Sequence, residues 1–167
     1  QDSLYHPKVD MRFRLDNGSL SLNREQEGVS RAPFINTYHD LDLFFDSFTW
    51  IQGQPLVLVS NLNLGASSPV VFESKAYFDA RVYDGLAGLG TVHPLVALSR
   101  YSYKYDEPLL TEGAASSALG LTVEQAKSIL LKLSTMGFIT YDTEGKTVRL
   151  NDKLETFVRS KSGTKDY

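Results

Sequence analysis

Residues 110–150 read LTEGAASSALGLTVEQAKSILLKLSTMGFITYDTEGKTVRL, and the signals in this stretch decide the fold of the C-terminal half. The alanine-rich residues 110–119 predict a helix that ends at Gly120. Thr122, followed three residues later by Gln125, forms a capping box that predicts the start of another helix, closing at Gly137. The apolar stripe expected for this helix consists of Val123, Ala126, Leu130 and Leu133. Two short strands, 138–141 and 147–150, are then expected around a polar turn.

Two further helices are expected on either side of this stretch. His93-Pro94 predicts a helix start before it, because proline favours the first helical turn, and residues 152–160 predict a last helix after it. The expected order of elements resembles the winged helix-turn-helix fold: two helices, a glycine-containing turn, a third helix and a β-hairpin. The resemblance covers about seventy residues and concerns the fold, because winged helices bind either DNA or protein.

The outer face of the helix after Thr122 is the candidate interaction face. It consists of Glu124, Gln125, Ser128, Leu131, Lys132 and Thr135. A DNA reader needs cations on this helix and on the wing, but the wing tip carries Asp142 and Glu144 against Lys146. Leu131 is expected on the outer face, where a DNA reader would have a hydrogen-bonding side chain. These features favour a protein partner, in the same chain or another, over nucleic acid.

The composition excludes several classes of protein. The chain has 167 residues, 42% of them hydrophobic and 22% charged, as in an ordinary globular protein. Residues 1–90 carry a net charge of −4 and residues 91–167 a net charge of +1, so neither half has the basic excess of a strong DNA binder. There is no cysteine for disulfides or thiolate zinc sites, and no apolar stretch is long enough for a membrane span.

The first half of the sequence predicts antiparallel strands. Residues 9–16 and 19–23 alternate apolar and polar side chains around Asn17-Gly18, which predicts a hairpin over residues 9–23. A two-residue turn there would pair Leu15 with Leu20 and Phe13 with Leu22. With Trp50, the only tryptophan, these are the expected structural anchors: Trp50, Phe13, Leu15, Leu20 and Leu22.

Further strands are expected up to about residue 72. A loop over 28–36 precedes alternating residues at 41–50, and then come the short apolar runs 56–59, 62–64 and 70–72. The glycine-rich residues 84–90 form the predicted connector. The fold class is therefore α+β: an antiparallel, β-rich region over residues 1–90, followed by a winged-helix domain over 91–167.

Candidate chemistry is sparse, and we expect no catalytic, cofactor-binding or metal-binding residues. A zinc site from His6, His39 and Asp40 or Asp42 lacks the spacing of a metal motif. Asp40, Asp42 and Asp46 would suit the acid–base chemistry of a carbohydrate-active enzyme or the acidic sheet face of a lectin, but the alternation favours a solvated polar face.

The tyrosines at 101, 103 and 105 would suit base stacking, yet their spacing on a helix favours a helix end with mixed burial. Both Tyr-His dipeptides, 5–6 and 38–39, are expected to pack at sheet edges with the imidazole bonded to a backbone carbonyl.

Short strings along nearly the whole chain resemble one protein family. They are Tyr5-His6-Pro7, Arg31-Ala32-Pro33-Phe34, Thr37-Tyr38-His39, Trp50, Phe72-Glu73-Ser74, Tyr77-Phe78, His93-Pro94-Leu95 and Gly163-Thr164-Lys165-Asp166-Tyr167. The chain resembles an internal segment of very large, uncharacterised envelope-associated proteins of Bacteroidota. The resemblance implies a non-enzymatic structural or protein-interaction role in the periplasm or at the cell surface, and a native chain that continues beyond Tyr167. The alternative is a cytoplasmic winged-helix DNA-binding transcription regulator.

Overall fold

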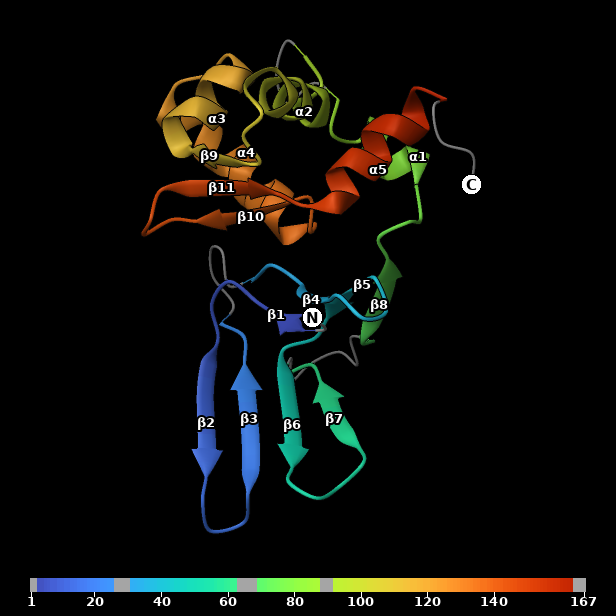
Figure 1. Cartoon of the computed structure of the whole chain (residues 1–167), viewed down its shortest axis with the longest axis vertical. Helices are drawn as coiled ribbons and strands as arrows, with labels where there is room; N and C mark the ends of the chain where they lie inside the picture. The colour runs from blue at the N-terminus through green and yellow to red at the C-terminus, as the bar shows by residue number, and fades with distance from the viewer. Residues whose placement is uncertain (1–2, 26–30, 63–68, 88–91, 164–167) are drawn as a thin grey trace. The chain divides into compact units, whose positions relative to one another are not determined.

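The computed structural model describes residues 3–25, 31–62, 69–87 and 92–163, which form two compact units (Figure 1). Unit 1 comprises residues 1–73 and unit 2 residues 74–167, and each has its own hydrophobic core. The fold is α+β, with antiparallel sheets in the first unit, and helices with a small antiparallel sheet in the second. The boundary lies before the glycine-rich segment rather than after it, and residues 88–90 of that segment lie outside the described residues.

Unit 1 contains two four-stranded antiparallel sheets. The first has the order β1-β4-β5-β8, and the second the order β2-β3-β6-β7. The strands are β1 (Leu4–Tyr5), β2 (Asp10–Arg14), β3 (Ser19–Asn23), β4 (Phe34–Asn36), β5 (Leu41–Phe44), β6 (Ser47–Ile51), β7 (Val57–Ser60) and β8 (Val71–Ser74).

The core of unit 1 is small and lies where the two sheets meet. Phe34, Leu43 and Phe45 are buried, with the rings of Phe34 and Phe45 stacked at 4.4 Å between centroids. Leu22, Phe48 and Val59 of the second sheet pack against them. The expected loop over 28–36 therefore contains a strand in its described part, because β4 is the strand that places Phe34 in this core.

The predicted hairpin forms, but its register differs from the expectation. Phe13 pairs with Leu20 and Met11 with Leu22, so the turn has four residues, 15–18, instead of two. Gly18 adopts a left-handed backbone (φ 60°) and the Asn17 side chain accepts a hydrogen bond from the Ser19 N–H, which stabilises the longer turn. The shift is two residues, so the same side chains stay on the same face of the sheet.

Unit 2 has the winged-helix arrangement. Its three-stranded sheet has the order β10-β11-β9, beside α3 and α4 (Figure 1). The elements are α1 (Ala80–Asp84), α2 (Pro94–Tyr105), β9 (Leu109–Thr111), α3 (Glu112–Leu119), α4 (Val123–Thr135), β10 (Ile139–Asp142), β11 (Thr147–Leu150) and α5 (Asp152–Lys161).

Local sequence signals account for most of the boundaries in unit 2. The Thr122–Gln125 capping box is present at the start of α4, and Gly120 ends α3 in a left-handed conformation. The expected helix over 110–119 starts later than predicted, because Leu110 pairs with Val148 as part of β9. α1 was not expected; its Tyr83 ring stacks on the His93 imidazole at 3.8 Å, which ties α1 to the start of α2.

Candidate interaction surfaces

The outer face of α4 offers few free polar groups. Glu124, Gln125, Ser128 and Lys132 are exposed. The Gln125 side chain accepts from the Thr122 N–H in the capping box, and the Ser128 and Thr135 hydroxyls donate to carbonyls of their own helix. Glu124 and Lys132 therefore remain as one charge of each sign for an incoming partner.

Leu131 does not lie on this outer face as expected. It is half-buried and packs against the helical core, and Thr135, one turn further on, is also half-buried. The reason is that the core reaches around more of α4 than the predicted stripe, since Ile129 and Ser134 are buried as well. Leu131 therefore lends no support to docking of a partner on this face.

The wing tip is folded around an acidic side chain. The Asp142 carboxylate accepts hydrogen bonds from the backbone N–H groups of Glu144 and Gly145, each at 2.9 Å. Asp142 and Glu144 are exposed beside a single wing-tip cation, Lys146, which leaves this loop net negative. Such a wing repels a phosphate backbone.

The base of the wing is tied to α3 by a buried polar pair. The Tyr141 hydroxyl donates to the Glu112 carboxylate, and both residues are buried. Burial, followed by the hydrogen bond to Glu112, raises the pKa of Tyr141 above its ordinary value. Both side chains thus have a structural role, because the pair satisfies polar groups inside the core.

One face of the second sheet of unit 1 is entirely apolar. The register places Phe13, Leu20, Trp50 and Val57 in one row across the four strands, and Met11, Leu22, Phe48 and Val59 in the next. We call these eight side chains the apolar sheet face. None of them is buried; Met11 is 66% exposed, Phe13 48% and Val57 53%. The row with Phe48 packs partly against the small core, whereas no side chain of the Trp50 row belongs to that core within the described residues.

The expected anchors therefore need correction. Phe13 is half-exposed, and Leu15, in the turn, is 89% exposed. Leu20, Leu22 and Trp50 are half-buried, and the Trp50 indole N–H donates to the Gln54 carbonyl at 3.2 Å. The apolar alternation correctly indicates one face, but in the described chain nothing covers that face completely.

The acidic residues near β5 do not form the solvated face that was expected. Asp40 is exposed, but Asp42 and Asp46 are only 1% and 3% exposed. Asp46 pairs with the Arg24 guanidinium at 2.8 Å and accepts the Leu62 N–H at 3.0 Å. Arg24 also donates to the Ala32 carbonyl, so this ion pair holds the segments around β3, β4 and β7 together. The charge of Asp46 is therefore paired within the fold, and of the three aspartates only Asp40 is exposed to a sugar.

Of the candidate zinc ligands, His6 is hydrogen-bonded within the fold. The His6 Nε2 bonds to the Ala32 carbonyl at 2.9 Å, as expected for a packed imidazole, and its Nδ1 accepts the Lys8 N–H at 3.1 Å. The packing expected for the other Tyr-His dipeptide is not observed, because Tyr38 and His39 are both exposed, with their rings edge-on to each other. Across residues 3–25, 31–62, 69–87 and 92–163, no three His, Cys, Asp or Glu side chains gather as they would around a metal ion.

A groove between α2 and α3 was not predicted from the sequence. Its cations, Arg100 and Lys104, and its tyrosines alternate along α2, while its opposite wall comes from α3. The tyrosines have the mixed burial that was expected: Tyr101 is half-buried, Tyr103 is 93% exposed and Tyr105 is 50% exposed. The repeated tyrosines were a signal for this site, but only the packing of α2 on α3 forms the groove.

Comparison of the chain with protein-family models, with curated proteins and with solved structures finds no match. In the parts of the chain that are described, none of the helices has the length and apolar character required to cross a bilayer.

Proposed function

We propose that this chain is a non-enzymatic structural and protein-interaction segment of a larger bacterial envelope protein. The single observation that carries the proposal is the apolar sheet face, eight apolar side chains of which none is buried. Soluble proteins rarely leave a large contiguous apolar patch exposed unless another surface covers it. The envelope setting rests on the family resemblance of the sequence.

The geometry of this sheet suits a partner that adds strands as well as side chains. Within the described residues, β2 and β7 are the edges of the sheet, and all five residues of β2 are exposed. An edge strand presents unpaired backbone groups that an incoming strand can bond, while its alternate side chains extend the apolar face. Removal of apolar area from water contributes roughly 25 cal/mol per Å², which makes such docking favourable. The partner is protein, either another part of the same polypeptide or another envelope component.

Site-specific photo-crosslinking tests this proposal with an internal control. A photoreactive phenylalanine analogue is placed at Phe13, on the apolar sheet face, or at Arg12, the adjacent residue on the opposite face of β2. Both positions are exposed, so neither replacement is expected to unfold the sheet. Irradiation of cells that produce the full native protein should give a protein crosslink at position 13 and a much weaker one at position 12.

Equal crosslinking at both positions, or none at either, would contradict the proposal. Mass spectrometry of the crosslinked peptide then distinguishes a partner within the same polypeptide from a second protein.

A DNA-binding regulator is the second candidate, and the observation that favours it is the winged-helix arrangement, in which one side of α4 carries exposed polar residues. The charge of the surface opposes it, because α4 exposes Lys127 and Lys132 beside Glu124, and the wing tip is net negative. Strong binders neutralise about six to ten phosphates.

We expect duplex DNA to bind no tighter than the nonspecific range of about 10⁻⁴–10⁻⁶ M at physiological salt. Fluorescence anisotropy with a labelled random duplex, over a series of salt concentrations, measures this. A sub-micromolar, sequence-selective complex that Lys132→Glu weakens would instead establish the regulator.

A further inference from the structure

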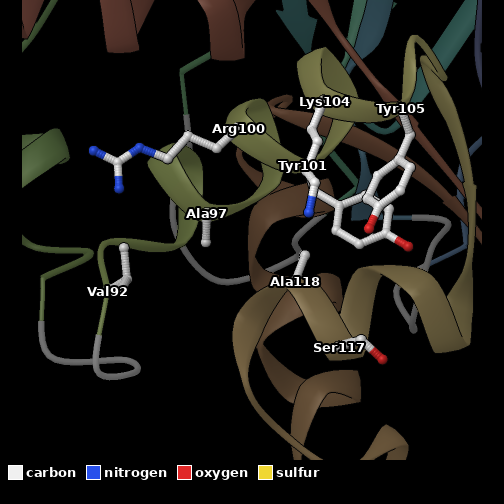
Figure 2. A pocket seen from close by; sticks show the side chains of 8 residues that line it. All are labelled: Val92, Ala97, Arg100, Tyr101, Lys104, Tyr105, Ser117 and Ala118. Atoms are coloured by element: carbon white, nitrogen blue, oxygen red, sulfur yellow. The ribbon is translucent and has the colours of Figure 1, made fainter.

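A shallow groove of about 390 Å³ runs between α2 and α3 in unit 2 (Figure 2). Its lining combines apolar, aromatic, hydroxyl and cationic side chains from both helices. They are Val92, Ala97, Arg100, Tyr101, Lys104, Tyr105, Ser117 and Ala118.

The two charged side chains that line the groove, Arg100 and Lys104, are both positive. Arg100 and Lys104 are one helical turn apart and therefore lie on the same side of α2, and both are exposed. Neither cation has an ion pair with a carboxylate of the described residues. α2 contains no acidic residue, and the only one in α3, Glu112, is buried and bonded to Tyr141. The groove therefore has two cations that are available to negative groups of a partner.

The aromatic side of the groove supplies an apolar contact beside these cations. The rings of Tyr101 and Tyr105 lie 4.5 Å apart between centroids and are tilted by 43°. Figure 2 shows their hydroxyl groups on the same side, and the Lys104 ammonium lies 5.1 Å from the Tyr105 ring centroid. Ala97 and Ala118, with short side chains, leave room between the helices for an incoming side chain.

We propose that this groove binds a short acidic peptide segment of a partner protein. An apolar or aromatic side chain of the peptide rests on Tyr101 and Tyr105, and flanking carboxylates meet Arg100 and Lys104. Charge complementarity selects this class of ligand: two cations suit a few carboxylates, whereas a nucleic-acid backbone requires a longer run of basic groups. The groove is separate from the apolar sheet face, so this proposal can fail while the proposed function stands.

The test uses a labelled peptide of seven residues with one central phenylalanine flanked by glutamates. Fluorescence anisotropy with the full chain at low salt should show saturable binding. Two reference peptides define what the groove recognises: one has lysine at every glutamate position, and the other has serine in place of phenylalanine. Both should bind more weakly than the acidic, phenylalanine-containing peptide.

Matched variants assign the binding to the groove. Arg100→Glu together with Lys104→Glu should raise the Kd by about tenfold or more, because two attractions between opposite charges become two repulsions between like charges. Lys127→Glu together with Lys132→Glu makes the same change of charge on α4 and should leave the Kd within about twofold. Tyr105→Ala, at a half-exposed position, tests the aromatic contact without a change in charge.

Three outcomes would overturn the proposal. Equal weakening by the α4 pair would show attraction by net charge alone, and equal binding of the serine peptide would remove the aromatic contact. Displacement of the peptide by random duplex DNA, with DNA binding that is lost in the Arg100→Glu and Lys104→Glu variant, would assign the groove to nucleic acid. Circular dichroism of each variant verifies that unit 2 is folded.

Discussion

Asp46→Ala is expected to lower the free energy of unfolding of unit 1 by about 3–5 kcal/mol, because it leaves a buried guanidinium without its carboxylate. The side chains of Arg24 and Asp46 are 13% and 4% exposed, and their charged atoms are 2.8 Å apart. The substitution also removes the acceptor of the Leu62 N–H. Urea unfolding followed by tryptophan fluorescence measures the loss, since Trp50 is the only tryptophan and lies in unit 1.

Asp10→Ala is the matched control. Its partner Arg12 is 3.2 Å away, but the two side chains are 47% and 76% exposed, so the expected change is only about 0–1 kcal/mol. A loss for Asp46→Ala no larger than that for Asp10→Ala would contradict the argument. Replacing both partners, Arg24→Met with Asp46→Leu, should cost less than Asp46→Ala because no charge is then left buried.

Phe157→Ala is expected to lower the free energy of unfolding of unit 2 by about 3–5 kcal/mol, because it opens a cavity in the main core. Phe157 is fully buried, and its ring centroid lies 4.9 Å from that of Phe138 and 5.1 Å from that of Phe78. Because Phe157 lies in α5, this burial makes α5 part of the core of unit 2. Urea unfolding followed by helical ellipticity at 222 nm measures the effect, since all described helices lie in unit 2.

Tyr103→Ala serves as the control for this core substitution. Tyr103 is 93% exposed on α2, so its removal should change the free energy of unfolding by no more than about 0.5 kcal/mol. If Phe157→Ala lowered the free energy of unfolding by no more than Tyr103→Ala does, α5 would contribute little to the core, contrary to its observed burial.

The winged-helix half was largely predictable because its signals are local. The capping box at Thr122 and the left-handed Gly120 act within a few residues of the helix ends that they define. β9 was missed because three residues next to an alanine-rich helix carry too little periodicity, and Leu110 becomes a strand residue only through its pairing with Val148. That pairing joins positions far apart in the chain, which a local pattern does not record.

In the β-rich half, the sequence established the alternation but not the division between sheets. Residues 41–50 read as one apolar pattern, yet β5 and β6 belong to different sheets. Asp46, between them, is buried because Arg24 reaches it from another segment. A carboxylate in an alternating pattern is normally solvated. No residue near Asp46 in the sequence indicates that a distant cation pairs with it.

The candidate sites were likewise predictable only in part from the sequence. Alternation was enough to place Phe13, Leu20 and Leu22 on one face of a sheet, since side chains in a strand follow a period of two. Whether that face is covered depends on which other segments pack against it, as does the burial of Leu131 at the edge of the helical core. The groove with Arg100 and Lys104 likewise exists only because α3 packs beside α2, a contact between two helices that neither helix encodes alone.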